Sequence, residues 1–459
     1  MNLNEFRNKF LDFEKQNDLF NKQINGWHFW EYIRVWVYYA FQDELFDFNK
    51  GARKWQKSRL SEKLRLIFKS ISLALFSNPF LKGKKADILI FTGSRRSKDN
   101  DGKDRDIYFD DIIDKTDKSV FVIEDFFQGG FYNDPATKNI AYVDFLYIFQ
   151  KFLKIFSKPN PKSLDDILLD MEKTFGTKIK KENIKNIFNN IWIEYRCFRK
   201  IYRHLINKID PELILETVSY GTWKMVFNKV AKKQKIPVIE LQHGFMGQYQ
   251  IPYNFSGTPK LESFPDKIFT FGEFWNETTD FPIEEKNIIS TGFPNFEKKR
   301  TNFNRERKNE TYLFISQPTI SEGLAEMALK LRKITDPQKT DIIYKLHPLE
   351  YSEWKKKLPE LAACENIEVI DNSNKDLYYY FANAGHQIGV YSTALIEGLG
   401  FGLHTYIAFL YGNEWMQQLI DSGNAVLVRS AEDILNNSVK ELSSDNIERF
   451  WKSNSSENL

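Results

Sequence analysis

Cysteine is scarce in this sequence, whose 459 residues include only Cys197 and Cys364. Two cysteines this far apart provide neither a disulfide framework nor a cysteine-based metal site, which suits a reducing cytoplasm. The start of the sequence lacks the apolar core of a signal peptide, and no run of 18 uncharged apolar residues follows. These absences predict a cytoplasmic protein without a membrane-spanning helix.

A strong excess of one charge is also missing. The formal net charge is +3, so the total charge does not indicate a nucleic-acid partner. With 42% hydrophobic and 28% charged residues, the composition is that of a soluble globular protein. The length exceeds that of one ordinary hydrophobic core, and we expect two domains.

One segment departs from this neutral average. Residues 53–85 contain ten Lys or Arg and a single acid, Glu62. A helical stripe of apolar residues runs through the segment at positions 64, 67, 68, 71 and 75. A basic amphipathic helix of this kind can lie on an anionic membrane, here the inner face of the cell membrane. The alternative is a helix that packs on its own domain and exposes a basic face to water.

Short apolar runs alternate with helical segments from residue 86 onward. In the first half, the runs 86–93, 119–126, 211–219 and 236–241 predict strands of a parallel sheet, because helical segments connect most of them. A second alternation of the same kind begins near residue 266. We therefore predict an α/β protein with two doubly wound, Rossmann-like domains that face a cleft.

Turn-rich stretches suggest where this chain divides. The segment IPYNFSGTPKLESFP, residues 251–265, predicts the connection between the domains, and the final KSNSSENL predicts a disordered end. The predicted parts are a helical N-terminal extension, 1–85; an N-terminal Rossmann-like domain, 86–255; a C-terminal Rossmann-like domain, 256–430; and a C-terminal helix with a tail, 431–459.

Polar residues stand where several of these strands end, and parallel α/β sheets bind ligands beyond the carboxyl ends of their strands. In the first domain, His243 follows the strand 236–241 within the motif LQHG. In the second domain, the candidate nucleotide-binding residues are Ser316 and Gln317 in SQP, Lys345, His347 and Pro348 in KLHP, and Ser392, Thr393 and Glu397 in STALIEGL.

The chemistry of these residue types favours a nucleotide. Ser392 predicts a helix N-cap, where free N–H groups and the hydroxyls of Ser392 and Thr393 can bind an anion. Glu397, one turn further along, can accept hydrogen bonds from ribose hydroxyls. Lys345 and His347 lie on one side of their strand and can both meet a phosphate. Each motif is also compatible with ordinary capping of a helix or a strand.

Three motifs, LQHG, KLHP and STALIEGL, occur in this order across the two predicted domains. This order resembles the GT-B glycosyltransferases of bacterial capsule and lipopolysaccharide synthesis, most closely the Kdo- and sialic-acid-type transferases that use CMP-sugars. The CDP-glycerol glycerophosphotransferases of teichoic acid synthesis have a similar late His-Pro and Ser-Thr pattern. The stretch GWHFWEYIR near the start also resembles a Trp-aromatic-Arg helix of such enzymes.

The resemblance implies that His347, Ser392 and Thr393 hold the donor's phosphate. A histidine, a lysine and a helix terminus then supply the positive potential at the leaving nucleotide, so we expect no metal and no other cofactor. The acidic triplet DRD, 104–106, is expected in a solvated loop rather than in a metal site. We expect His243, at the end of the last strand of the first domain, to contact the donor sugar or its carboxylate, unless its role is structural.

An acceptor hydroxyl needs a base, which should come from the first domain. The candidates at predicted strand ends are Glu216, Glu124 and Asp125. The pair Glu124–Asp125 resembles an acidic pair of sialyltransferase-like families, although Phe126 follows it where those families have Gly. In a retaining enzyme, one of these carboxylates would instead be the nucleophile. The sequence leaves this choice open.

These expectations combine into one functional hypothesis. The sequence predicts a metal-independent GT-B glycosyltransferase that moves a sugar, preferably a CMP-linked 2-keto acid sugar, to a surface polysaccharide or lipid-linked glycan. The alternatives are a UDP-sugar 2-epimerase-like enzyme, a CDP-polyol phosphotransferase and a non-catalytic protein of capsule assembly. A nucleotide-sugar donor, a glycan acceptor and an anionic membrane are the expected partners, and nucleic acid is not.

Overall fold

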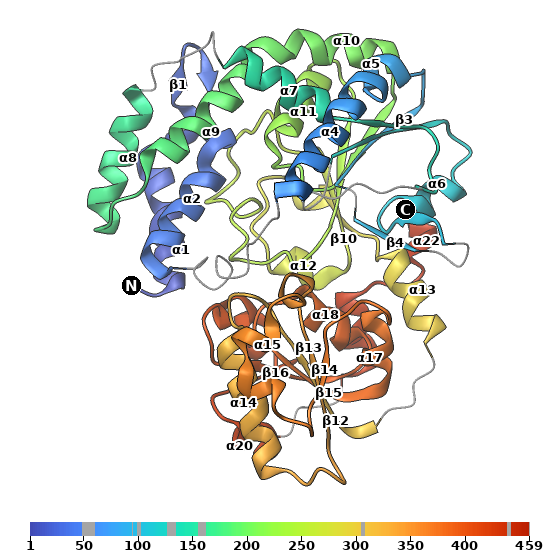
Figure 1. Cartoon of the computed structure of the whole chain (residues 1–459). Coiled ribbons are helices and arrows are strands. Elements are labelled where there is room, and N and C mark those ends of the chain that lie inside the picture. The colour runs from blue at the N-terminus through green and yellow to red at the C-terminus, as the bar shows by residue number, and fades with distance from the viewer. Residues whose placement is uncertain are drawn as a thin grey trace.

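The computed structural model consists of two α/β domains, one above the other in Figure 1, each built on its own sheet. It describes residues 1–47, 60–93, 95–98, 102–125, 135–154, 162–303, 308–437 and 442–458. The predicted fold class, two Rossmann-like domains in a GT-B-like arrangement, is confirmed by the topology of the two sheets.

The first sheet has seven parallel strands among the described residues, in the order β11-β10-β9-β8-β3-β6-β7. Apolar residues such as Ile90, Val122 and Ile214 lie at its centre and are buried, because helices cover both faces of a parallel sheet. The strands are β3 (Ile88–Thr92), β6 (Val120–Glu124), β7 (Ile140–Tyr142), β8 (Leu213–Glu216), β9 (Val238–Leu241), β10 (Lys267–Thr270) and β11 (Ile288–Ser290).

Helices from the first half of the chain surround this sheet (Figure 1). The segments predicted as helical, 1–80 and 141–208, are helical over most of their described residues. The main helices are α1 (Leu3–Gln16), α2 (Trp30–Phe46), α4 (Leu60–Phe76), α5 (Pro79–Lys82), α6 (Asp110–Lys115), α7 (Asp144–Leu153), α8 (Lys162–Phe175), α9 (Lys181–Ile193), α10 (Arg199–Ile209) and α11 (Thr222–Lys233).

The Trp-aromatic-Arg helix belongs to the core. Trp30 of α2 is buried, and so is Arg34, whose Nε lies 2.7 Å from Oε1 of Glu14 in α1. Arg34 also donates to the carbonyl oxygens of Ile251 (2.6 Å) and Asn254 (3.0 Å). Through these bonds, Arg34 connects the N-terminal helices to the long loop that follows β9.

The second sheet has six parallel strands among the described residues, in the order β14-β13-β12-β15-β16-β17. Its helices include α14 (Ser321–Ile334), α17 (Leu377–Asn383), α18 (Thr393–Gly400) and α20 (Ala431–Asn436). The strands are β12 (Lys308–Ile315), β13 (Asp341–Lys345), β14 (Glu368–Ile370), β15 (Ala384–Gly389), β16 (His404–Ala408) and β17 (Val426–Val428).

The domain boundary expected at residues 255/256 is wrong. Strands β10 and β11 extend the first sheet, with Ile268 of β10 opposite Glu240 of β9. The chain therefore crosses to the second sheet only after α13 (Pro294–Asn302). Segment 251–265 is a loop within the first domain, because prolines and turn signals do not reveal whether the next strand returns to the same sheet. The strand before His243, β9, is accordingly an interior strand and not the last.

The expectation of a disordered C-terminal end is also wrong for the described residues. After α21 (Ser444–Phe450) the chain lies against the first domain, where Lys452 N donates to Phe271 O at 2.8 Å. The short helix α22 (Ser455–Asn458) follows, and the buried Ser455 binds the carboxylate of Glu297. A Cβ atom on Gly292 would lie 2.2 Å from the carbonyl oxygen of Lys452, so only glycine permits this close packing.

Candidate functional site

The loop after β9 meets the start of α18 at the boundary between the two domains. Phe245 N donates a hydrogen bond to the hydroxyl oxygen of Thr393 at 3.2 Å. A Cβ atom on Gly244 would lie 3.7 Å from the same oxygen, an ordinary contact. The fold thus brings together two of the three predicted motifs, LQHG and STALIEGL, which are far apart in the sequence.

His243 is partly buried on this loop, with 22% of its side chain exposed. Its Nδ1 lies 3.7 Å from Oε1 of Glu240, and the rings of Tyr220 and Tyr253 are neighbours at 6.2 and 6.3 Å between centroids. Burial, together with the charges of Lys224 and Arg95, lowers the pKa of His243 to about 3. The imidazole is therefore neutral at physiological pH and can exchange hydrogen bonds with a ligand.

A group of buried charges lies beneath His243. Glu240 is fully buried and accepts hydrogen bonds from Tyr253 Oη (2.5 Å) and Ser219 N (3.2 Å). Lys224, on α11, is also buried, and burial lowers the pKa of its ammonium. The sequence reasoning missed both residues. The available signal was a glutamate within the apolar run VIEL, because a carboxylate inside a buried strand requires hydrogen-bond partners.

Glu216 belongs to this buried group and does not face the cleft. It is fully buried at the end of β8, and its Oε1 accepts a hydrogen bond from Asn228 Nδ2 at 2.5 Å. Burial raises the pKa of Glu216 to about 8, against the lowering influence of Lys224. Direct contact between this carboxylate and an acceptor is not supported by the geometry.

The acidic pair Glu124–Asp125 also has structural partners. Glu124 is buried in an ion pair with Arg96. Asp125 accepts hydrogen bonds from Tyr147 Oη at 2.8 Å and from Trp223 Nε1 at 3.0 Å. Both carboxylates therefore stabilise the packing of the first domain, and this geometry does not support the predicted role as base or nucleophile.

The KLHP motif forms a capped turn. His347 Nδ1 accepts a hydrogen bond from Leu349 N (3.2 Å), and His347 N donates to Oε2 of Glu350 (2.6 Å). Pro348 occupies the first position of this helical turn, where its missing N–H costs nothing. Burial and the charge of Lys345 lower the pKa of His347. Because Nδ1 is an acceptor, the neutral ring has its proton on Nε2, which is a hydrogen-bond donor.

The residues beside His347 already have partners. Lys345 Nζ donates to Tyr351 Oη at 2.6 Å and to Asn372 O at 3.1 Å. Ser316 Oγ donates to Oε1 of Glu350 at 3.0 Å, and burial raises the pKa of Glu350 to about 7.

Gln317, which follows Ser316, differs from these residues. Its Oε1 is buried without a hydrogen-bond partner among the described residues. An unsatisfied buried amide oxygen marks a place where a ligand or a water molecule can supply a donor.

The start of α18 matches the prediction in one respect and departs from it in another. Ser392 is the N-cap, and its Oγ accepts a hydrogen bond from Ala394 N at 3.2 Å. Glu397, predicted to bind ribose, is buried with 8% exposure. Burial raises the pKa of Glu397, whereas the charge of Arg95 and a hydrogen bond with Tyr378 lower it. Glu397 therefore serves contacts within the protein.

Arg95 is a residue that the sequence reasoning missed. Its Nη1 donates to Tyr108 Oη at 3.0 Å, and Tyr108 Oη donates to the carbonyl oxygen of His243. Its charge acts on Glu397 of the second domain and on His243 of the first. Arg95 thus acts on groups of both domains. The available signal was a pair of arginines, Arg95 and Arg96, close after the predicted strand 86–93.

The triplet DRD does not lie in a solvated loop, contrary to expectation. It forms strand β5 (Asp104–Asp106), which pairs with β4 (Arg96–Lys98). Asp106 is buried and accepts hydrogen bonds from the backbone N–H groups of Tyr108 (2.9 Å) and Phe109 (3.1 Å). Within the described parts of the chain, no three His, Cys, Asp or Glu residues form a metal site. Independence from metals stays a prediction.

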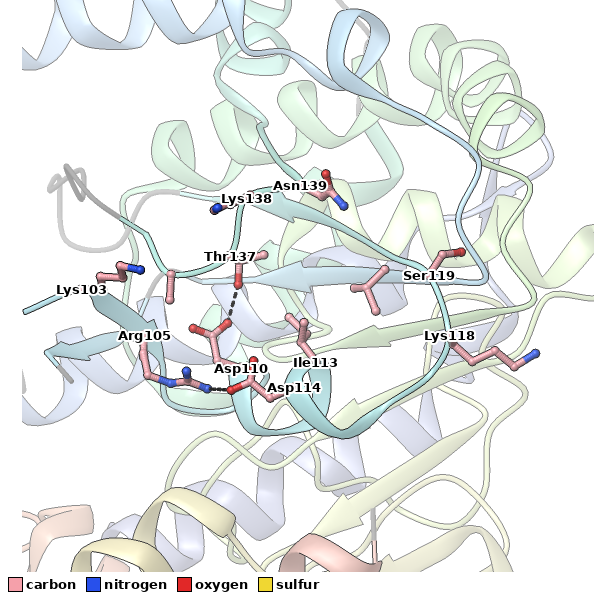
Figure 2. A pocket seen from close by; sticks show the side chains of 12 residues that line it. Lys103, Arg105, Asp110, Ile113, Asp114, Lys118, Ser119, Thr137, Lys138 and Asn139 are labelled. Atoms are coloured by element: carbon pink, nitrogen blue, oxygen red, sulfur yellow. Dashed lines mark hydrogen bonds and ion pairs between the residues drawn. The ribbon is translucent and has the colours of Figure 1, made fainter. Parts of the chain in front are cut away.

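A cavity of about 520 Å³ lies away from the domain boundary, beside α6 and the start of β6 (Figure 2). Its charged side chains largely bind one another or their neighbours. Arg105 pairs with Asp114, and Thr137 Oγ1 donates to Asp110 at 2.6 Å. None of the predicted site residues lines this cavity.

Comparison with known proteins gives structural neighbours only. No family model matches the chain, and no curated protein matches it in sequence. Among solved structures, a UDP-GlcNAc 2-epimerase from Methanocaldococcus jannaschii aligns with 81% of this chain and 97% of its own, at 14% identity and a TM-score of 0.46.

Two further neighbours are named as a glycosyltransferase and as a polymerase. A glycosyltransferase of kitacinnamycin aligns with 80% of this chain and 93% of its own, at 11% identity and a TM-score of 0.43. The wall teichoic acid polymerase TagF aligns with 85% of this chain and 90% of its own, at 11% identity and a TM-score of 0.42. These scores are too low to assign an activity, and the fold assignment rests on the strand order of the two sheets.

Proposed function

We propose that this protein is a GT-B glycosyltransferase that binds a nucleotide-linked sugar between its two domains. The observation that supports this best is the meeting of the His243 loop with the N-terminus of α18, joined by Phe245 N and Thr393 Oγ1. A crevice at the carboxyl ends of parallel strands is where ligands of such sheets bind. The N-terminus of a helix favours the phosphate of a nucleotide.

In this proposal, the second domain holds the donor's phosphate. Ser392 and Thr393 supply hydroxyls at the helix start, and the Nε2–H of His347 supplies a further donor. These groups stabilise the negative charge that develops on the leaving nucleotide, as fixed donors do in many transferases. His347 acts here as a neutral donor, because its pKa is lowered.

The proposed donor is an anionic sugar nucleotide, with a CMP-linked 2-keto acid sugar preferred. The charges of Lys224 and Arg95 both act on His243, so an anionic group of the donor beside His243 would be attracted by these two cations. A carboxylate or a phosphate gains more from this field than a neutral sugar. The CMP preference itself rests on the resemblance of the three motifs.

The acceptor in this proposal is a surface polysaccharide or a lipid-linked glycan, and the enzyme acts in the cytoplasm. The acceptor's base stays unassigned, because Glu216 and Glu124 are buried with partners and the partly exposed Asp125 accepts hydrogen bonds from Tyr147 and Trp223. His243, on the first-domain side, is partly exposed, and its imidazole has no hydrogen-bond partner on Nδ1 among the described residues. We assign to it a hydrogen bond with the donor sugar or its carboxylate.

The test is a calorimetric comparison of CMP, CDP, UDP and GDP on the wild-type protein and on His347→Ala. The matched control is Leu349→Ala, an exposed side chain in the same turn. Tight CMP binding that is lost in His347→Ala and kept in Leu349→Ala supports the proposal. A preference for UDP favours a hexosyltransferase or an epimerase, and a preference for CDP favours a polyol phosphotransferase. Failure to bind any nucleotide favours a non-catalytic assembly protein.

A further inference from the structure

Two neighbouring helices, α4 and α7, expose an unusual number of large apolar side chains. On α4, Phe68 is 71% exposed and Phe76 is 70% exposed, and Ile67 and Leu75 are also exposed. On the adjoining α7, Phe152 is 56% exposed. We call this surface the α4–α7 face. Contiguous apolar surface of this kind on a soluble domain marks a site of interaction.

The face has a positive charge at its edges. The exposed cations are Arg65 and Lys69 on α4, Lys82 on α5, Lys84 just after α5, and Lys151 on α7. The segments 64–85 and 145–154 contain no Asp or Glu. An apolar surface with these cations at its edges complements a bilayer that contains acidic lipids, because the bilayer interior is apolar and its surface is anionic. Residues 53–59 of the basic segment lie outside the described residues.

One helical stretch in the described part of the chain, Leu64–Lys82, is long and apolar enough to cross a membrane. The packing of α4 argues against that orientation. Ser70 Oγ donates to Oδ1 of the buried Asp144 at 2.5 Å, and Leu73 is buried. Tyr142 N, at the end of β7, donates to Ser77 O at 2.9 Å. The helix then ends, and Asn78 caps α5.

We infer that the α4–α7 face docks the protein on an anionic lipid bilayer, with α4 parallel to the membrane at the boundary between headgroups and acyl chains. One side of α4 remains packed on the first domain while Phe68, Phe76 and their exposed neighbours enter the lipid. None of these residues belongs to the proposed nucleotide site, so the inference does not depend on the proposed reaction.

The experiment measures co-sedimentation of the full chain with two kinds of vesicles, phosphatidylcholine alone and phosphatidylcholine with about one-third phosphatidylglycerol. The wild type is expected to bind the anionic vesicles and to bind the neutral ones much more weakly. The variant Ile67→Glu/Phe68→Glu should lose at least tenfold in binding, because two charges would enter the apolar layer. The variant Lys69→Gln/Lys82→Gln should lose about 25-fold on anionic vesicles, about fivefold for each cation removed.

The matched control is Leu169→Glu on α8, which changes an exposed leucine outside the α4–α7 face and should leave vesicle binding unchanged. Circular dichroism verifies that each variant is folded. Equal vesicle binding by wild type and Ile67→Glu/Phe68→Glu would overturn the inference. The inference would also be overturned if the wild type did not bind vesicles, formed a dimer, and became a monomer in this variant. That result would assign the face to self-association. Binding that resists alkaline carbonate would show that α4 spans the bilayer instead.

Discussion

The backbone N–H of Phe245 donates a hydrogen bond to the hydroxyl of Thr393, which is 148 positions away in the sequence. This contact joins the loop after β9 in the first sheet to the first turn of α18 in the second. A nucleotide that binds at the start of α18 must share or replace this bond. In the proposed complex, ligand binding and the contact between the two domains would therefore depend on the same hydroxyl.

Replacing Thr393 with valine removes this hydroxyl and keeps the shape of the side chain. We expect CMP affinity to fall about tenfold, the size of one hydrogen bond to a charged group. Isothermal titration calorimetry measures the change. The control is Thr301→Val on α13, an exposed threonine whose hydroxyl donates to the carbonyl oxygen of Glu297 at 2.9 Å. Unchanged affinity in Thr393→Val would place the phosphate elsewhere.

Arg95→Met should lower the free energy of unfolding by about 2 kcal/mol, because Tyr108 loses a partner and the buried Glu397 loses a compensating charge. Urea denaturation measures the loss. Glu397→Gln in the Arg95→Met background should recover part of it, with a coupling energy of about 1 kcal/mol between the two residues. Strictly additive effects would mean that Arg95 does not act on Glu397.

His243 gives the stability a defined dependence on pH. Its pKa is about 3 in the folded protein, below the ordinary value of 6.5, because burial and the charges of Lys224 and Arg95 disfavour the imidazolium. Between these two values the unfolded chain binds a proton that the folded protein does not. The free energy of unfolding therefore rises with pH by about 1.4 kcal/mol per unit in this window and is level, for this group, above it.

The variant His243→Gln lacks this contribution. The difference between the unfolding free energies of wild type and variant should therefore increase from about pH 4 to about pH 7 and then stay constant. Urea titrations at several pH values measure both proteins, and the other titrating groups cancel in the difference. A constant difference across this range would mean that His243 has an ordinary pKa.

Chelation tests the phosphate site. If Ser392, Thr393, His347 and the helix terminus stabilise the leaving nucleotide, transfer from a nucleotide sugar should continue in excess EDTA at an unchanged rate. A coupled assay for released nucleotide follows the reaction. If transfer stopped in EDTA and recovered on addition of Mg²⁺ or Mn²⁺, these residues would not be sufficient to stabilise the leaving nucleotide.

Local features of this protein were predictable from its sequence, and features that depend on distant partners were not. The strand of 86–93 and the N-cap at Ser392 follow from short patterns of apolar and hydroxyl residues, and both are observed. The sheet to which residues 267–290 belong was not predictable, because strand order is set by contacts far along the chain. A turn-rich loop looks the same inside a domain as between domains.

The same limit applies to the candidate site. Asp125 looked available at a strand end, but Tyr147 and Trp223, from two other elements, bind its carboxylate. Arg95 does not stand out in the sequence, but in the structure it donates to Tyr108 and its charge acts on Glu397 of the second domain. Residue type and strand position identify the region of a site. Whether a side chain is bound by other residues or is available to a ligand is decided by the tertiary structure.

The return of α21 and α22 to the first domain has a mechanical consequence. Both ends of the described chain lie on the first domain, and the second domain is connected to it by two passages of the backbone (Figure 1). A force applied between the termini acts first on the contacts of Lys452 and Ser455 with the first domain. Tension reaches the second sheet only after this C-terminal segment has been pulled away, so the second domain bears no load until the segment detaches.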